Sequence, residues 1–135
     1  MVCMKTNMDL SWNPSIPEIQ TESDFSKVID KASIVYIYSP QCSACIHSQP
    51  IFNTEVSKLY KDLPQEVSIY RYNAVPSENE AEIKERHDMY KRVLGIPLQH
   101  YPTILGISNQ GTLVEYSGPV TEHKIMNFMR ALKKT

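Results

Sequence analysis

Apolar side chains recur along the chain at two spacings, which together predict alternating strands and helices. Residues 34–38 form a short run of β-branched and aromatic side chains that is apolar on both faces, as is typical of a central, doubly covered strand. Residues 67–74 alternate between two faces and predict a second strand. The other expected strands are residues 103–108 and 112–116, joined as a hairpin by Asn109-Gln110-Gly111, and a short edge strand from Ile16 to Gln20 interrupted by Pro17.

Four segments carry apolar residues three and four positions apart, the spacing of amphipathic helices. We expect these helices at residues 23–31, 43–63 and 77–94, and from Thr121 through Leu132. Thr21 or Ser23 can cap the first helix, Ser77-Glu78-Asn79-Glu80 fits a capping box for the third, and Gly95 ends that helix. Pro50 lies inside the second helix and should kink it, because proline donates no backbone hydrogen bond.

The predicted order is β-α-β-α-β-α-β-β-α, which indicates an α/β fold. A parallel βαβ half followed by a hairpin gives a central mixed β-sheet of four to five strands, flanked by about four helices. Residues 1–15 have no periodicity and are interpreted as an N-terminal arm. Residues 16–135 form the single domain.

Composition narrows the possible partners. The chain has 135 residues, 41% of them hydrophobic, and a net charge of −1, which argues against binding nucleic acid or an anionic membrane. No apolar run approaches the roughly 20 residues of a membrane-spanning helix, and the first residues lack the features of a signal peptide. We therefore expect a cytoplasmic monomer. An oxidising compartment stays open, because a mature fragment without its targeting segment would look the same.

The chemistry centres on Cys42-Ser43-Ala44-Cys45, where the central strand hands over to a helix. Residues three apart on a helix have Cβ atoms about 5–6 Å apart, and a small tightening reaches the roughly 3.5–4.5 Å of a disulfide. A helix N-terminus also stabilises a thiolate. This spacing favours a reversible dithiol–disulfide pair in which Cys42 attacks and Cys45 resolves.

A Cys-x-x-Cys motif can also be half of a zinc site. Zinc needs about four ligands, and the other candidates form no second pair at metal-ligand spacing; they are Cys3, His47, His87, His100 and His123. We therefore expect no metal and no other cofactor. Cys3 makes the cysteine count odd, which does not indicate a disulfide scaffold.

Several of these residues, taken together, resemble the thioredoxin superfamily over residues 16–132. They are Cys42-Ser43-Ala44-Cys45 after the apolar strand, Pro50, Tyr101-Pro102-Thr103 before the hairpin, Gly111 in its turn and Gly118 before the last helix. The resemblance implies that Pro50 is the helix-kinking proline and that Pro102 is a cis-proline whose loop packs beside the cysteines. It also implies that the backbone of Tyr101 pairs with the substrate.

The chain departs from that family's usual pattern at four places. Gln41 replaces the tryptophan before the first cysteine, and Ser43-Ala44 replaces Gly-Pro or Gly-His between the cysteines. Tyr36 stands where a buried acid serves as a proton relay, and Arg71 where a lysine accompanies it. The Tyr36 hydroxyl could replace the acid weakly, or water could serve, but an ordinary core role for Tyr36 is favoured.

Three functions remain open. The first is a thiol–disulfide oxidoreductase in cell redox homeostasis, with catalytic Cys42 and Cys45, supporting residues Gln41, Ser43, Ala44, Pro50, Tyr101 and Pro102, protein disulfides as substrates and a redox partner protein. The second is a catalytically weak binding or assembly module, which the missing tryptophan and acid favour somewhat. The third is a metal site at the cysteine pair. The sequence does not determine whether the first would reduce, oxidise or isomerise.

Overall fold

A computed structural model describes residues 16–62, 67–116 and 121–134 of the chain. In these segments the elements are α1 (Glu22–Val28), β1 (Ser33–Tyr38), α2 (Ser43–Asp62), β2 (Ser68–Asn73), α3 (Glu80–Leu94), β3 (Thr103–Ile107), β4 (Leu113–Tyr116) and α4 (Glu122–Lys134). The predicted α/β class, with helices on both sides of a mixed sheet, is confirmed. The predicted arm over residues 1–15, Cys3 and Gly118 lie outside the described residues.

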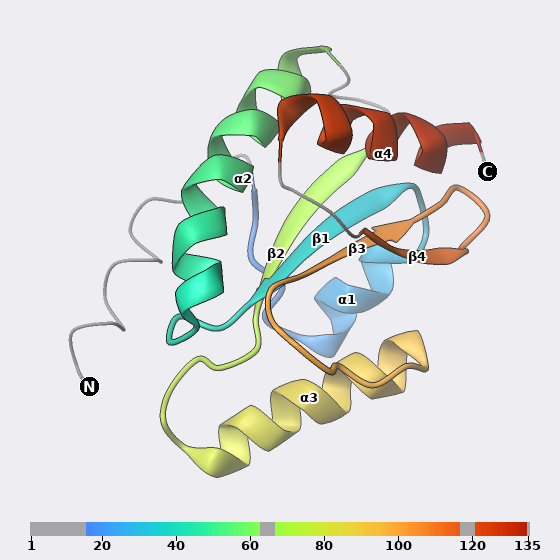
Figure 1. Ribbon diagram of the computed structural model, residues 1–135. Helices are drawn as coiled ribbons and strands as arrows, with labels where there is room; N and C mark the ends of the chain where they lie inside the picture. The colour runs from blue at the N-terminus through green and yellow to red at the C-terminus, as the bar shows by residue number, and fades with distance from the viewer. Residues whose placement is uncertain (1–15, 63–66, 117–120, 135) are drawn as a thin grey trace.

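The four strands form one sheet in the order β2-β1-β3-β4. β1 pairs in parallel with β2 and antiparallel with β3, and β3 and β4 form the predicted hairpin. Helices α2 and α4 cover one face of this sheet, and α1 and α3 cover the other (Figure 1). The central position of β1 explains why its side chains are buried on both faces.

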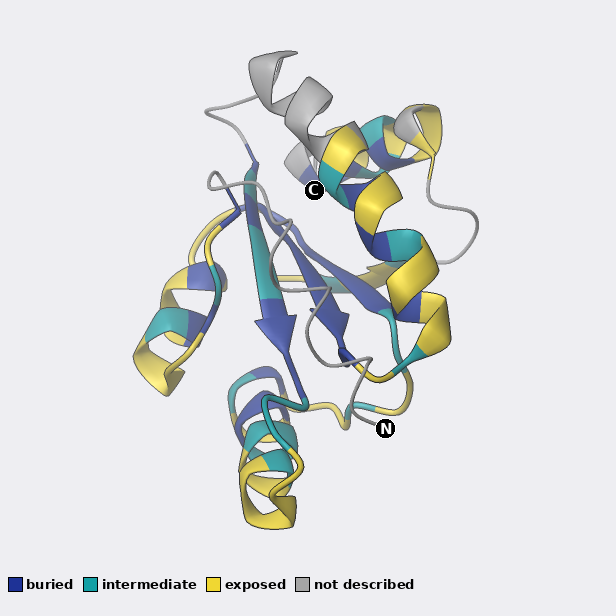
Figure 2. Cartoon of the chain, turned by 90° about the vertical axis from the view of Figure 1, so that its left-hand side faces the viewer, coloured by how far each residue is buried: buried dark blue, intermediate teal, exposed yellow. Residues whose placement is uncertain are grey.

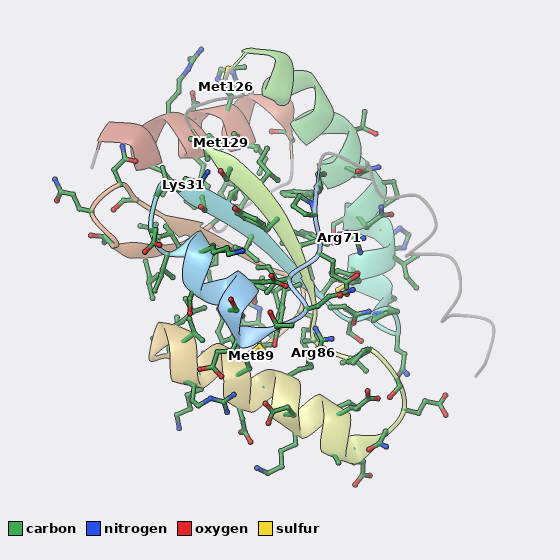
Figure 3. The ribbon with its side chains drawn as sticks, turned by 180° about the vertical axis from the view of Figure 1, so that it is seen from behind. Lys31, Arg71, Arg86, Met89, Met126 and Met129 are labelled. Carbon is green, nitrogen blue, oxygen red and sulfur yellow. The ribbon has the colours of Figure 1, made fainter. Side chains whose placement is uncertain are left out.

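Alternation along β1 divides the core into two clusters. Ile34, Tyr36 and Tyr38 pack toward α2 and α4, whereas Val35 and Ile37 pack toward α1 and α3. Figure 2 shows buried strands at the centre of the sheet, between helices whose outer faces are exposed. Met129 of α4 and Met89 of α3 lie on opposite sides of the sheet, one in each cluster (Figure 3).

The helix ends show which capping predictions hold. Thr21 caps α1 in a reciprocal capping box, because it accepts from the backbone of Asp24 and the Asp24 carboxylate accepts from the backbone of Thr21. The capping box predicted at Ser77 is wrong. Asn79 caps α3 instead, accepting from the N–H groups of Ala81 and Glu82. The short Asn side chain reaches these two of the free amides of the first turn.

Gly95 ends α3 as predicted, in the left-handed conformation with φ of 78°. The N–H of Lys124 donates to Thr121 Oγ1, so Thr121 caps α4.

None of the helices in the described segments combines the length and apolar character of a membrane span.

The edge strand predicted from Ile16 to Gln20 is reduced to one parallel bridge between Glu18 and Arg71. Pro17 cannot donate a backbone hydrogen bond, which limits the ladder at this edge. The Arg71 side chain secures the segment, because its guanidinium bonds the Ile16 carbonyl (3.2 Å), the Glu18 carboxylate (3.3 Å) and the Tyr38 hydroxyl (3.2 Å). Arg71 is therefore part of the structural framework of this edge (Figure 3).

Candidate functional site

The two cysteines lie where β1 passes into α2. In the connecting turn the Ser39 carbonyl accepts from the N–H of Cys42 at 3.1 Å, and Ser39 Oγ accepts from the N–H of Gln41 at 3.2 Å. The Cys42 carbonyl accepts from Ile46 at 3.0 Å, so Cys42 immediately precedes the first turn of α2. The helix N–H groups without intrahelical partners are at this end and favour negative charge there.

The two free thiols differ in their access to solvent. Cys45 is fully buried, whereas Cys42 is half-buried. Burial raises the pKa of the Cys45 thiol to about 12, the neighbouring Cys42 also raises it, and the backbone N–H of Ser39 opposes the shift. Cys45 is therefore a neutral thiol near neutral pH, and Cys42 is the sulfur that an external disulfide can reach.

This raised pKa predicts that reduced protein loses stability in alkali. The folded-state pKa of Cys45, about 12, lies above its ordinary value of 9.0, so the folded state holds the proton more tightly. The resulting stabilisation is complete below about pH 9 and is lost as pH rises toward 12. Urea unfolding across this range should show a falling free energy of unfolding.

The control for this prediction is Cys45→Ala. Burial also raises the pKa values of Tyr72 and Tyr90 to about 12, so the variant should keep part of the decline but have a shallower slope. Equal slopes in the two proteins would contradict a contribution from Cys45.

The loop before β3 lies beside Cys42. β3 runs antiparallel to β1 and pairs Thr103 with Ile37, so the residues before β3 are placed next to the end of β1. The Tyr101–Pro102 peptide bond in this loop is cis. The Cys42 thiol donates a long hydrogen bond to the Tyr101 carbonyl, with 3.7 Å between sulfur and oxygen. The sheet thus brings the loop of Tyr101 and Pro102 to the end of β1 that leads into Cys42 and Cys45.

The Tyr101 side chain has a partner that the sequence analysis did not pair with it. Its hydroxyl hydrogen-bonds Nε2 of His87 on α3, and the two rings stack with centroids 5.9 Å apart and 15° between their planes. The sequence indicates His87 only as a candidate metal ligand. Its position on the polar side of a charged helix carried no signal of this contact, which joins residues 14 positions apart.

Tyr36 lies in the core beneath α2. Its ring stacks on Phe52 at 4.7 Å, and its hydroxyl bonds Ser48 Oγ at 2.6 Å and donates to the Cys45 carbonyl at 3.3 Å. Burial raises the pKa of the Tyr36 phenol well above its usual range, so the group is neutral. These contacts favour a structural role, in which Tyr36 ties the first turns of α2 to β1.

Replacing Tyr36 with phenylalanine should therefore affect stability more than chemistry. Loss of the hydroxyl removes two hydrogen bonds from a buried site and should cost about 1 kcal/mol or somewhat more of unfolding free energy. The rate of disulfide exchange should stay within about twofold of the wild type, because the Phe52 stacking is kept. Denaturant unfolding and a stopped-flow exchange assay measure the two effects.

Ser48→Ala provides the matched control, since it removes the same hydrogen bond from the α2 side. A tenfold or larger loss of exchange rate in Tyr36→Phe, with little loss of stability, would overturn the structural assignment and place the hydroxyl in proton transfer.

The remaining residues predicted for the site are exposed around the cysteines. Gln41 precedes Cys42, and Ser43 and Ala44 form the first turn of α2, all three open to solvent. Pro50 lies inside α2, also exposed, two turns beyond Cys42. Among residues 43–54 of this helix, the buried side chains are Cys45, Gln49 and Phe52, whereas Ile46 is 39% exposed.

The other histidines considered in the sequence lie apart from this arrangement. His47 is exposed on α2, and His100 pairs with Glu115 at 3.0 Å and contacts Thr103. Across the described segments, no three or more histidine, cysteine or carboxylate side chains come together in a way that could hold a metal ion.

Sequence comparison places this chain in no known family. No model of a protein family matches it, and no curated protein does either.

Structural comparison finds many solved proteins of similar fold. Thioredoxin of Malassezia sympodialis aligns with a TM-score of 0.61 at 17% identity, over 91% of this chain and 95% of its own. The first thioredoxin domain of mouse protein disulfide-isomerase A4 gives 0.63 at 17% identity, over 93% and 81%. Human ERp44 gives 0.68 at 18% identity, over 90% of this chain and 30% of its own. The chain thus spans nearly all of the first protein and under a third of the last.

Proposed function

We propose that this chain, which has the thioredoxin fold, is a thiol–disulfide oxidoreductase that acts on protein disulfides. The observation that carries the proposal is the unequal pair of free thiols at the start of α2. Half-buried Cys42 faces the Tyr101 carbonyl, and buried Cys45 lies one helical turn further on. This arrangement suits a two-step exchange in which the accessible sulfur attacks and the buried sulfur resolves.

The exchange balances in atoms and electrons. The Cys42 thiolate attacks one sulfur of a substrate disulfide, forms a mixed disulfide with it and releases the other substrate sulfur as a thiolate. Cys45 then transfers its proton to a released substrate thiolate and attacks Cys42 Sγ, which releases the second substrate thiolate. The substrate gains two electrons and the Cys42–Cys45 pair becomes a disulfide. The reverse sequence donates a disulfide to a dithiol.

The partners follow from this cycle. The substrates are disulfides or dithiols of other proteins, and a redox partner protein returns the pair to its starting state. The exposed Gln41, Ser43 and Ala44 surround the attacking sulfur, and the backbone of Tyr101 is available beside it to pair with the substrate chain. Pro50 lies in the helix and the cis Pro102 lies in the loop that form this surface.

The experiment that tests the function is the reduction potential of the Cys42–Cys45 pair. The protein is equilibrated in glutathione buffers and its free thiols are trapped. Potentials of such pairs run from about −270 mV in reductases to about −120 mV in oxidants. A value near the first indicates a reductase in a reducing compartment such as the cytoplasm. A value near the second indicates a disulfide donor in an oxidising one. Failure to form the disulfide at any poise would overturn the proposal.

A binding or assembly module is the second candidate. Gln41 in place of tryptophan and the structural role of Tyr36 favour it, because both residues depart from a redox-active pattern. This function predicts a stable partner complex that survives Cys42→Ser and Cys45→Ser. Turnover of protein disulfides by the wild type, lost in Cys42→Ser, would decide against it.

A further inference from the structure

Tyr101, the aromatic residue beside Cys42, has a side-chain partner on α3, outside the cysteine motif. The backbone carbonyl of Tyr101 accepts from Cys42, while its side chain extends to α3 and bonds His87. The phenol and the imidazole lie almost parallel, at 15°, so the histidine restrains both the position and the tilt of the ring. Tyr101 is half-buried, which leaves part of this restrained ring at the surface.

His87 is itself well placed to restrain a neighbour, because α3 is anchored at that level. The Tyr72 hydroxyl donates to the carbonyl of Arg86 at 2.7 Å. The Arg86 guanidinium donates to the carbonyls of Ile19 (3.3 Å) and Asn73 (3.4 Å). These bonds connect α3 to the segment before α1 and to the end of β2 (Figure 3). The imidazole thus extends from a fixed backbone.

A packing contact also places the Tyr101 side chain near the reactive sulfurs, because Tyr101 and Cys42 both pack against the core cluster that contains Cys45. The pKa of Tyr101 is raised first by burial and then by Cys45 and Cys42. A charge on either sulfur is therefore felt at the Tyr101 hydroxyl, the same group that bonds His87.

We propose that His87 is a positioning residue for substrate recognition, which holds the Tyr101 ring as one wall of the peptide-binding surface beside Cys42. This inference rests on the proposed oxidoreductase function. A small disulfide needs only the sulfur of Cys42. In a peptide disulfide, the residues around the disulfide also pack against the Tyr101 ring. The ring therefore contributes to peptide binding and not to the chemical step.

The test compares two substrates in wild type and His87→Ala. One is a peptide disulfide, and the other is 2-hydroxyethyl disulfide, which is too small to reach the wall. For the peptide we expect kcat/KM to fall about fivefold through KM, the factor given by one ordinary hydrogen bond. For the small disulfide the rate should stay within about twofold. His87→Gln, which keeps a hydrogen-bonding group, should restore much of the peptide affinity.

Tyr101→Phe tests whether His87 acts through the hydroxyl. It should reproduce the loss for the peptide, and the double variant should be no worse than either single variant, because both remove one interaction. The ring-carbon chemical shifts of labelled Tyr101 should move in His87→Ala. His123→Ala, which removes an exposed imidazole on α4, is the control and should change neither these shifts nor the kinetics.

The outcomes separate the two proposals. If the wild type exchanges neither substrate, the proposed function fails. If the wild type is active and His87→Ala matches it on both substrates, the positioning role is overturned while the function stands. Equal losses on both substrates would also overturn it, because they would place the effect on the cysteines themselves.

Discussion

Cys42→Ser is expected to abolish disulfide exchange, with a loss of roughly a thousandfold or more in turnover of a protein disulfide. The serine hydroxyl cannot form the mixed disulfide, and buried Cys45 has no access to an external substrate. Overall structure should be kept, because Cys42 is only half-buried and its backbone bonds to Ser39 and Ile46 use no atom of the Cys42 side chain. An insulin-type reduction assay or a labelled peptide disulfide measures the loss.

Cys45→Ser should fail at the other step. Cys42 can still attack, but nothing resolves the intermediate, so the protein should accumulate as a mixed disulfide visible by mass spectrometry. Cys3→Ser is the matched control, since it removes the third cysteine of the sequence and should leave turnover unchanged. Full turnover in Cys42→Ser would show that Cys42 is not the attacking residue. Accumulation of the mixed disulfide in Cys42→Ser instead of Cys45→Ser would reverse the two roles.

Phe52→Ala is expected to have the largest effect on stability, a loss of about 3–5 kcal/mol. Phe52 is fully buried and stacks on Tyr36, in the same core cluster as Cys45. Removing the ring leaves a cavity between α2 and the sheet, and domains of this kind have only about 5–15 kcal/mol of total stability. Denaturant unfolding measures the loss. Cys45 should also be alkylated faster, because weaker packing of α2 exposes its buried thiol more often.

Ile51→Ala is the control for this substitution. Ile51 is the preceding residue of the same helix and is 45% exposed, so its truncation should cost well under 1 kcal/mol. A loss for Phe52→Ala no greater than that of Ile51→Ala would show that α2 does not depend on this contact.

Much of the fold could be predicted because its signals are local. The doubly apolar run at residues 34–38 identified the central strand, and the helical spacing of apolar residues located the helices to within a few positions. Errors occurred where local signals compete. Ser77 and Asn79 both precede α3, and only the backbone geometry decides that Asn79 accepts the first amides. At residues 16–20, apolar residues indicated a strand, but Pro17 limits the ladder to one bridge.

The candidate site divides in the same way. The cysteine pair at a strand-to-helix junction is a local motif, and its spacing already indicates how one thiol can attack and the other resolve. The burial that separates their roles is not local, since it depends on packing of Cys45 in the cluster that holds Phe52 and Tyr36. Nor does the sequence indicate that the Tyr36 hydroxyl bonds Ser48. This contact forms only when α2 packs on β1.

The sequence by itself thus determined the α/β order, the central strand and the Cys42–Cys45 motif, because hydrophobic periodicity and short spacings act between neighbours along the chain. The family resemblance, and no periodicity or spacing in the chain, indicated that the Pro102 loop lies beside the cysteines. Only the tertiary structure shows the contact of the Tyr101 carbonyl with Cys42 and the bond of the Tyr101 hydroxyl to His87 of α3. The antiparallel pairing of β3 with β1 produces the first contact, and the packing of α3 on the sheet produces the second. Both depend on segments far apart in sequence, whose proximity no local pattern encodes.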